Sequence, residues 1–321
     1  MSGLPFLDAD AIRGAVPIAD LLDVVETAYR DVAAGRDRSP LRSHAALDAG
    51  DLLLMPGLRA DGAGVSVKLV TIVPGNAARG LPTLHALVVW LDAASGEPLA
   101  LMDGSTITAM RTGAASGVAT RLLARPDSAT LAVIGAGAQA EWQVRAVLAA
   151  RPISRVLVHA RSAAARAAFA ERMTEEVGVP VEAASSAERA VREADVVCCA
   201  TTSVEPVFDA SWLRPGTHVN GIGAFRLGMV ELPPELFARA ATVAVDSRAA
   251  VMAEAGDVVA AIERGLLAEA ELVEVGTIGR DWVRTRAPDA ITAFKSVGLA
   301  IQDVAAAELV ARRLLGDQPA D

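Results

Sequence analysis

Cysteine and aromatic residues are scarce in this chain of 321 residues. The only two cysteines, Cys198 and Cys199, are adjacent. Successive side chains of a strand point to opposite faces, so a disulfide between them is not expected. Two small buried hydrophobic residues in a reducing compartment are the simpler interpretation. Because aromatic residues make up only 3% of the chain, its core must be built mainly from Ala, Val and Leu.

Long apolar runs and an excess of basic charge are also absent. No window offers the ~20 uncharged apolar residues that a membrane span requires. The N-terminus has no basic region followed by an apolar run, the pattern typical of a signal peptide. Thirty Lys and Arg against thirty-nine Asp and Glu give a net charge of −9, which argues against sequence-independent binding of nucleic acid. We therefore expect a cytoplasmic protein that binds neither membranes nor nucleic acid.

The residues that are present describe an ordered protein, 52% hydrophobic and 21% charged, and its length favours two domains. Residues 19–34 have the periodicity of an amphipathic helix. Strands are expected over residues 52–55, ending at Pro56, and over residues 65–73 and 84–91, before a helix over residues 107–123. Successive strands without intervening helices predict a mostly antiparallel or mixed sheet.

After Pro126 the pattern changes to alternating strands and helices. Strands are expected over residues 129–134, 155–159, 179–183, 195–200, 218–222 and 242–245, with helices over residues 138–149 and 163–173. Short apolar runs that alternate with helices predict a parallel sheet covered on both faces. The expected fold class is α/β, with a Rossmann-type doubly wound sheet. A last helix, over residues 298–315, lies beyond this sheet.

The sequence GAGAQA at residues 135–140 directly follows an expected strand and opens an expected helix. Gly135 permits a tight turn, Gly137 lets the backbone approach a pyrophosphate, and Ala140 is small enough for close packing of helix on strand. The amides of Ala138 and Gln139 at the helix N-terminus would face the phosphates. The spacing of strand, turn, helix and second strand predicts a dinucleotide site.

The end of the second strand determines which dinucleotide binds there. An acidic residue at this position would accept hydrogen bonds from the adenosine ribose of NAD and repel a 2′-phosphate. The chain instead has His159-Ala160-Arg161-Ser162. Arg161 can pair with a phosphate dianion and Ser162 can donate to it, which favours NADP over NAD. A solvated arginine at a helix N-terminus is the alternative.

Five segments together resemble the ornithine cyclodeaminase/mu-crystallin family, whose members also include archaeal alanine dehydrogenase and cyclic imine reductases. These segments are GVSVKLVTI (64–72), GLPTL (80–84), LMDGSTITAMRTGAAS (101–116), GAGAQAE (135–141) and AFKSVGLAIQDVAA (293–306). The resemblance implies a homodimer. It also implies a discontinuous α+β substrate-binding and dimerisation domain, residues 1–125 joined by a C-terminal helix at 297–321, and a Rossmann dinucleotide-binding domain at 126–296.

In this family, basic residues of the first domain hold the α-carboxylate of the substrate, and the matching positions are Arg42, Lys68 and Arg111. Lys68 interrupts an apolar β-run, where a buried ammonium is costly unless it meets an anion. Arg111 interrupts a helix of small residues, and its guanidinium can bind a carboxylate through two hydrogen bonds. A surface lysine, an internal salt bridge and, for Arg42, a solvated turn residue are the alternatives.

Further candidates have weaker support. His85 could donate a proton to the substrate nitrogen, although a packed or surface histidine is an equal alternative. Thr83 and Thr112 could orient substrate or cofactor groups, or only satisfy the backbone. The loops expected at the carboxyl end of the sheet add Thr201, Thr202, Val219 and Gly221. The resemblance adds Ser296 and Gly298, which match the family segment that approaches the nicotinamide. Asp303 is expected to have a structural role there. No cluster of His, Cys or carboxylate residues has the spacing of metal ligands.

The chain departs from the cyclodeaminating members of this family at one position. Those members carry an Asp within a Gly-Ala-Asp-x-Pro-Gly-Lys-x-Glu-Leu type of pattern, which acts during deamination and ring closure. The matching stretch here is GAFRLGMVEL at residues 223–232, and Phe225 stands where the Asp would be. A phenyl ring cannot accept a proton, which argues against cyclodeamination unless the alignment slips or a carboxylate elsewhere replaces the Asp.

The leading hypothesis is therefore an NADP- or NAD-dependent reductase of cyclic or N-linked ketimine carboxylates, of the pyrroline-2-carboxylate or piperideine-2-carboxylate type. Arg42, Lys68 and Arg111 would anchor the carboxylate, and His85 or water would supply the proton. The alternatives are an ornithine or lysine cyclodeaminase that recycles NAD, an alanine-type amino-acid dehydrogenase, and a protein that binds the dinucleotide without catalysis.

Overall fold

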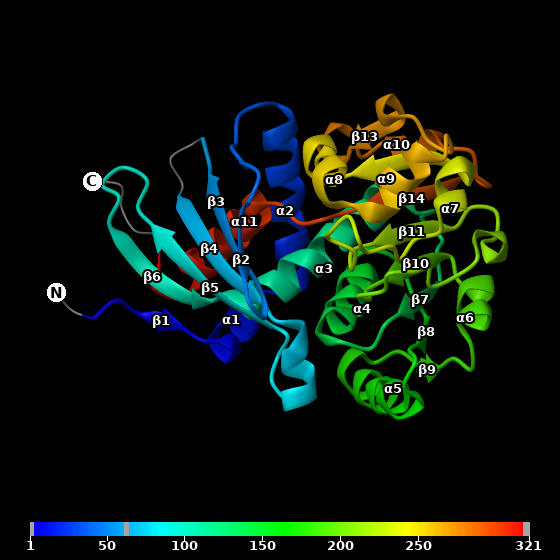
Figure 1. Ribbon diagram of the computed structural model, residues 1–321, viewed down its shortest axis with the longest axis horizontal. Coiled ribbons are helices and arrows are strands. Elements are labelled where there is room, and N and C mark those ends of the chain that lie inside the picture. Colours follow the sequence, from blue (N-terminus) through cyan, green and yellow to red (C-terminus); the bar gives the residue numbers. More distant parts are fainter. Residues whose placement is uncertain (1–2, 61–63, 317–321) are drawn as a thin grey trace. The chain divides into compact units, whose positions relative to one another are not determined.

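The computed structural model describes residues 3–60 and 64–316. Contacts within it group the chain into two units (Figure 1). Unit 1 comprises Met1–Arg111 and Leu299–Asp321, and unit 2 comprises Thr112–Gly298. The chain passes between the units inside helix α3 (Gly104–Leu123) and again after Gly298. Within the described residues, no helix is both long and apolar enough to cross a membrane, and no group of three or more His, Cys, Asp or Glu residues is placed to hold a metal ion.

Unit 2 contains an eight-stranded sheet in the order β13-β12-β14-β11-β10-β7-β8-β9, and every neighbouring pair is parallel. Its strands are β7 (Thr130–Ile134), β8 (Arg155–His159), β9 (Val181–Ala183), β10 (Val196–Cys199), β11 (His218–Gly221), β12 (Ala240–Val245), β13 (Leu272–Glu274) and β14 (Ile291–Lys295). The helices between them are α4 (Ala138–Ala150), α5 (Ala163–Val177), α6 (Ala187–Glu193), α7 (Pro234–Arg239), α8 (Arg248–Glu254), α9 (Gly256–Glu263) and α10 (Trp282–Thr285). The strand order reverses between β7 and β10, as in a Rossmann fold, so the predicted fold class is confirmed.

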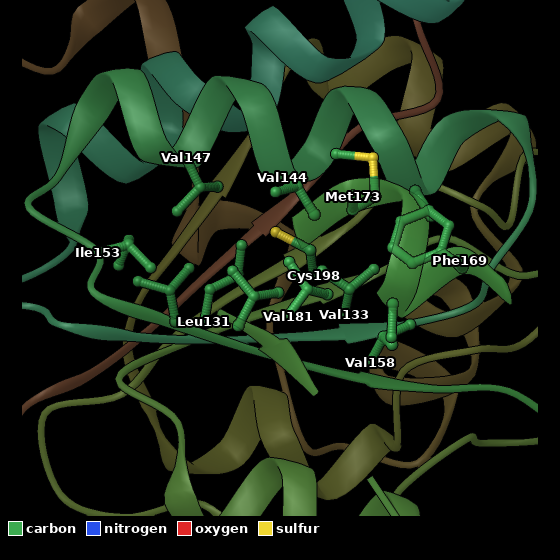
Figure 2. Close-up of a cluster of buried hydrophobic side chains, with 14 of the residues drawn as sticks. Leu131, Val133, Val144, Val147, Ile153, Val158, Phe169, Met173, Val181 and Cys198 are labelled. Carbon is green, nitrogen blue, oxygen red and sulfur yellow. The ribbon is translucent and has the colours of Figure 1, made fainter. Parts of the chain in front are cut away.

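Small apolar side chains build the core of this unit. Figure 2 shows Val144 of α4 and Phe169 and Met173 of α5 pointing toward the side chains of the sheet, among them Val133 and Val158. Cys198 of β10 belongs to this cluster and both cysteines are free. Because all of these residues are shielded from water, α4 and α5 are fixed on the sheet, and α4 holds its N-terminus beside the end of β7.

The register of the parallel strands aligns their carboxyl ends. Ile134 pairs with Cys199, Cys199 with Gly221, Gly221 with Lys295, and Lys295 with Val245. The five segments that follow these strands therefore emerge side by side at one edge of the sheet. Ligands of open α/β folds bind at this edge.

Unit 1 contains a six-stranded sheet in the order β1-β6-β5-β4-β3-β2. Its strands are β1 (Phe6–Leu7), β2 (Ser43–Leu47), β3 (Gly50–Leu58), β4 (Val65–Ile72), β5 (Leu84–Leu91) and β6 (Pro98–Asp103). Only β1 and β6 pair in parallel, so the expected mixed sheet is confirmed. Three helices accompany it: α1 (Ala9–Ala15), α2 (Ile18–Ala33) and α11 (Ala300–Leu315).

Helix α11 covers one face of this sheet, and α2 packs on α11. The helix lies so close to β3 that a Cβ at Gly57 would come within 2.4 Å of the Val304 side chain and 2.9 Å of the Ala300 carbonyl oxygen. All residues from 300 to 311 are buried, including the polar Gln302 and Asp303. Such a helix can carry buried charge only where a partner meets it.

Strand β3 differs from the prediction, because it continues through Pro56 to Leu58 instead of ending at Pro56. Pro56 pairs with Val67 of β4, whereas β2 reaches only as far as Leu54 on the other side. The missing amide of Pro56 therefore falls where β3 lacks a β2 partner, a position at which proline is tolerated. Strands β1, β2, β6, β13 and β14 were not predicted.

Candidate active site

The predicted phosphate-binding turn starts at Gly135, which has φ +118°. A Cβ at this position would come within 2.5 Å of the carbonyl oxygen of Ala200, in the loop after β10. The Gly135 amide donates to the carbonyl oxygen of His159 over 2.8 Å. Only glycine satisfies both the backbone angle and the space, and the turn therefore connects the ends of three adjacent strands.

Gly137 differs from Gly135, because nothing lies within 4 Å of the position of its missing Cβ. It is the N-cap of α4, and no side chain caps this helix. Ala140 is fully buried against the sheet, whereas Gln139 is half-buried and its Oε1 has no partner among the described residues. Uncapped amides and open space at a helix N-terminus are what a bound pyrophosphate needs, so these residues fit a dinucleotide.

The end of β8 carries two basic residues. Arg161 and Ser162 are both exposed, and the Ser162 hydroxyl accepts from the Ala165 amide over 3.2 Å as the N-cap of α5. Sequence reasoning missed Arg166, whose Nη1 lies 3.3 Å from His159 Nδ1 and donates to the Ala160 carbonyl at 3.3 Å. A second guanidinium therefore lies beside the end of β8.

The residues predicted near the ends of β10 and β11 lie in different surroundings. The Thr201 amide and hydroxyl donate to Glu231 Oε2 at 3.0 and 3.1 Å, while Thr202 is exposed. Val219 is fully buried in the middle of β11. Gly221 ends that strand, where a Cβ would come within 2.4 Å of the Leu232 side chain.

Ser296 and Gly298 follow β14 and are held by Asp246, which follows β12. Asp246 Oδ2 accepts from the Ser296 hydroxyl at 2.7 Å, from the Val297 amide at 2.9 Å and from the Gly298 amide at 2.8 Å. Burial raises the pKa of Asp246, and these hydrogen bonds oppose that rise. Gly298 has φ +86°, so its turn also depends on glycine.

A second cluster of charge lies within unit 1. Lys68 of β4 places its Nζ 2.9 and 2.8 Å from the two carboxylate oxygens of Asp303 on α11. Arg111 of α3 donates from Nε to Asp303 at 3.0 Å and from Nη1 to Gln302 at 2.8 Å. Gln302 in turn donates to the hydroxyl of Tyr29. Lys68, Arg111 and Asp303 are 1%, 5% and 0% exposed, so an internal salt bridge, one of the alternatives for the two cations, is present.

This salt bridge leaves an excess of positive charge, since two buried cations share one carboxylate. Burial lowers the pKa of Lys68 to about 7, Asp303 opposes this shift, and Arg111 and Arg42 add to it. Among the described residues, Arg111 uses only Nε and Nη1, so its Nη2 remains available to a ligand. A buried site with this charge favours an anion.

The structure brings Lys68 and Arg111 together, with Arg42 near enough to act on the pKa of Lys68. It does not bring His85 to them. His85 is exposed and pairs with Thr71, three residues from Lys68 on β4, so His85 and Lys68 lie on opposite faces of the sheet.

Thr112 and Thr83 belong to different surroundings. Thr112 is buried within α3, whereas half-buried Thr83 accepts from the Val73 amide through its carbonyl. Phe225 is half-buried in the loop after β11, and the guanidinium of Arg226 lies 5.3 Å from the centre of its ring. The expected structural role of Asp303 agrees with its two ion pairs.

Three residues that hold these sites together by hydrogen bonds were not predicted from the sequence. They are the carboxylates Asp246 and Glu231 and the amide Gln302. Asp246 could have been found, because it is a carboxylate directly after an expected strand. Gln302 and Asp303 share a signal too, since they are the two polar residues in the otherwise apolar run of residues 297–307.

Comparisons with known proteins agree with this geometry. Residues 5–318 match the family model for the ornithine cyclodeaminase/mu-crystallin family. A Delta(1)-pyrroline-2-carboxylate reductase of Bacillus cereus is 37% identical over 313 residues, which cover 96% of each chain. The structure of the Thermococcus litoralis Delta(1)-pyrroline-2-carboxylate reductase in complex with NADH and L-proline has a TM-score of 0.92 at 35% identity and covers 97% of this chain and 98% of its own.

An archaeal alanine dehydrogenase, described as a dimer with bound NAD, has a TM-score of 0.88 at 31% identity and covers 97% of this chain and 96% of its own. The family, the α/β fold and the nicotinamide cofactor predicted from the sequence are therefore confirmed, and the chain is an NAD(P)-dependent oxidoreductase. The choice between NADP and NAD stays a prediction, as do the roles of the individual site residues.

Proposed function

The chain belongs to the ornithine cyclodeaminase/mu-crystallin family, and we propose that it reduces the C=N bond of cyclic or N-linked ketimine carboxylates. Pyrroline-2-carboxylate and piperideine-2-carboxylate represent this class, and the product is a secondary α-amino acid. The observation that carries the proposal is the buried cluster of Lys68, Arg111 and Asp303, whose excess positive charge matches a single substrate carboxylate. The similar reductases of Bacillus cereus and Thermococcus litoralis support the same substrate class.

Within this proposal, Lys68 and Arg111 bind the α-carboxylate and Asp303 orients both cations. Asp303 fixes the ammonium and the Nε of the guanidinium, and Gln302 fixes Nη1. Both cations are thereby positioned before substrate arrives, which reduces the entropy lost on binding. Arg42, which is partly buried, adds positive charge to the same anchor.

Gly135, Gly137 and the N-terminus of α4 would hold the pyrophosphate of the cofactor, and Ser296 and Gly298 would border its nicotinamide end. When bound, the reduced nicotinamide supplies the hydride that adds to the imine carbon. Arg161 and Ser162 favour NADP, because a 2′-phosphate would meet a guanidinium there and no acidic residue lies between residues 155 and 170.

Water is the proton source that we propose for the imine nitrogen. His85, the other candidate, is exposed on the sheet face opposite Lys68. A substrate that binds as the iminium ion needs no donor at the moment of hydride addition, so an ordered acid is not required.

Phe225 argues against the cyclodeaminase alternative. Glu231 is the only carboxylate between residues 222 and 231, and it could in principle replace the missing Asp. However, Glu231 is fully buried and accepts hydrogen bonds from Thr201, Gly223 and Ala224. It is therefore committed to holding backbone and cannot serve as a base toward an amine.

We also propose that two copies of the chain associate through the sheet of unit 1. Helix α11 covers only the face that carries Lys68, and the opposite face is apolar and only partly buried. Its apolar residues are Leu52, Leu54, Val65, Val67, Leu69, Leu87, Val89, Leu91 and Leu101, and Thr71 and His85 also lie on this face. An apolar sheet face of this extent usually marks an interface, and the similar archaeal alanine dehydrogenase is a dimer.

The proposed reaction can be tested by following oxidation of NADPH and of NADH with pyrroline-2-carboxylate, piperideine-2-carboxylate, and pyruvate with ammonia or methylamine. Ammonia release from ornithine is measured in parallel. We expect NADPH oxidation with the cyclic imines and no ammonia from ornithine. Ammonia release without net oxidation or reduction of the cofactor would instead identify a cyclodeaminase.

A further inference from the structure

We propose that Glu231 is a positioning residue, which holds the loops after β10 and β11 in the conformation that receives the nicotinamide half of the dinucleotide. The inference deepens the proposed function and rests on the cofactor binding at this edge of the sheet. Glu231 itself does not touch the reacting atoms. It acts through the backbone of two loops that do border the site.

Glu231 joins these loops by hydrogen bonds to both of its carboxylate oxygens. Oε2 accepts from the amide and the hydroxyl of Thr201, at 3.0 and 3.1 Å. Oε1 accepts from the amide of Gly223 at 2.5 Å and from that of Ala224 at 3.3 Å. One side chain therefore satisfies donors from the loop after β10 and from the loop after β11. It adds to the backbone hydrogen bonds from Val230 to Ser203 and from Val207 to Glu231 that also join the two loops.

Glu231 lies in a group of three ionisable side chains that are completely buried. Lys295, the last residue of β14, places its Nζ 3.9 Å from Glu231 Oε1 and 3.1 Å from Asp257 Oδ2. All three side chains are 0% exposed. Two carboxylates and one ammonium leave an excess negative charge, and the amides around Glu231 compensate for it. Burial of so much charge is costly, which is why a purely structural purpose would be met more simply by apolar residues.

The loop after β11 lies in close contact with its neighbours on both sides. A Cβ at Gly223 would come within 2.0 Å of the Thr201 carbonyl oxygen. A Cβ at Gly256, the first residue of α9, would come within 2.2 Å of the Leu227 carbonyl oxygen and 2.5 Å of that of Met229. The loop is therefore enclosed between the β10 loop and α9, and Glu231 connects these contacts.

The register of the sheet assigns this loop pair to the nicotinamide half. In a Rossmann fold, the adenosine ribose lies at the end of the second strand and the pyrophosphate at the first turn, here β8 and Gly135. The nicotinamide half therefore extends to the other side, over β10, β11 and β14. Gly135 lies directly against the β10 loop. A Cβ added at Gly135 would lie 2.5 Å from the Ala200 carbonyl oxygen and 3.6 Å from the Thr201 side chain.

This arrangement requires Glu231 to be ionised, since both oxygens accept and a proton on either one would oppose a donor. Burial raises the pKa of Glu231 to about 7; Lys295 opposes this shift and Asp257 adds to it. Cys198 and Cys199 of β10 are the other titratable groups that act on this cluster, and burial keeps both thiols protonated near neutral pH. Affinity for the nicotinamide half should therefore fall as the pH decreases through about 7.

The test compares two ligands on the full-length protein at pH 8. NADPH contains the nicotinamide, and 2′-phospho-ADP-ribose has the same adenosine and pyrophosphate without it. We expect Glu231→Gln to weaken NADPH by about tenfold, since an amide places a donor against donors, and to change the affinity for 2′-phospho-ADP-ribose by less than about twofold. Glu235→Gln is the matched control, because Glu235 is exposed on α7, and it should change neither affinity.

Equal weakening of both ligands, or no weakening of either, would overturn the proposal. If Glu231→Gln fails to fold, Asp257→Asn provides the second test. Removing that carboxylate should lower the pKa of Glu231, so the acid limb of NADPH binding should move to lower pH. An unmoved limb, or one that moves to higher pH, would contradict the positioning role. Because only binding is measured, the result does not depend on whether an imine is the substrate.

Discussion

The two units each bury a cluster of three charged side chains, but the two clusters carry opposite excess charge. In unit 1, Lys68 and Arg111 share one carboxylate, Asp303. In unit 2, two carboxylates, Glu231 and Asp257, share one ammonium, that of Lys295. Burial lowers the pKa of Lys68 to about 7 and raises that of Glu231 to about 7.

The two clusters differ in the groups that compensate their excess charge. Backbone amides of Gly223 and Ala224 and the amide and hydroxyl of Thr201 surround Glu231, so the protein itself satisfies both oxygens of that carboxylate. Lys295 Nζ and Asp257 Oδ2 have no hydrogen-bond partner among the described residues. The unit 1 cluster has no second carboxylate among the described partners of Lys68 and Arg111. A buried cation without compensation is costly, so the unit 1 cluster is suited to bind an anion, whereas the unit 2 cluster is suited to hold the loops after β10 and β11.

The largest effect that this comparison predicts is the loss of an anchor. Lys68→Met or Arg111→Leu should lower kcat/KM for pyrroline-2-carboxylate by roughly 100-fold or more, because a desolvated charge pair with the substrate is lost. The affinity for NADPH should change by less than about threefold, since the cofactor residues belong to unit 2.

Steady-state kinetics and a cofactor titration on the same preparations provide both numbers. If both variants retain wild-type kcat/KM, the assignment of these residues as anchors is wrong. If NADPH binding falls as much as kcat/KM, the effect is structural.

A smaller effect is expected from pH. In its proposed role, Lys68 would bind the substrate carboxylate only when it is protonated, and burial lowers its pKa to about 7. As the pH rises through this value, the ammonium loses its proton and the excess charge of the cluster disappears. We therefore expect kcat/KM to fall above pH 7 by about tenfold per pH unit.

Lys68→Arg is the matched variant for this pH profile, because a guanidinium stays protonated. Its kcat/KM should stay level over the same range, even if its maximum is lower. An alkaline limb that is identical in the wild type and the variant would assign the titration to another group or to the substrate.

An effect of about tenfold on the affinity for NADPH is expected at the end of β8. Arg161→Ala should weaken NADPH by about that factor, through loss of a charge-assisted hydrogen bond, and leave NADH unchanged. Arg166→Ala tests whether the second guanidinium at the end of β8 contributes. A wild-type protein that binds NADH more tightly than NADPH would contradict the predicted preference.

The smallest effect is a difference in melting temperature between alanine variants of two glycines in the same turn. Gly135→Ala should lower the melting temperature, because its φ of +118° and the nearby Ala200 carbonyl oxygen exclude a side chain. Gly137→Ala should leave the melting temperature within about 2 °C, since nothing lies near its Cβ position, and weaken the cofactor several-fold. Equal melting temperatures of the two variants would show that the turn is not constrained as described.

Much of the architecture could be predicted, because each strand and helix of the Rossmann unit has a local signal. The expected strands at residues 155–159 and 84–91 agree with the structure at both ends. Strand β14 was missed, although its five residues are all buried, because such a short apolar run has no periodicity that distinguishes it. The continuation of β3 through Pro56 could not be predicted, since the sequence does not reveal how far β2 extends.

The charged partners could not be predicted in the same way. Asp303 lies 235 positions from Lys68, and no local pattern states which buried carboxylate meets which cation. The face of the sheet on which His85 lies could not be predicted for a related reason. Its face depends on the pairing of Thr71 with His85, which is set by the connection between β4 and β5 and not by either strand alone. The family resemblance identified Lys68 and Arg111 as candidates, but it did not identify the carboxylate of Asp303 as the partner of both.

The most direct test of the central claim compares two ketimines that differ only in the carboxylate. Pyrroline-2-carboxylate and 2-methyl-1-pyrroline would be reduced with NADPH by the wild type and by Arg111→Leu, and kcat/KM measured for each. The account predicts a preference for the carboxylate of at least about 100-fold in the wild type, which Arg111→Leu largely abolishes. Equal kcat/KM of the wild type for both imines would contradict it.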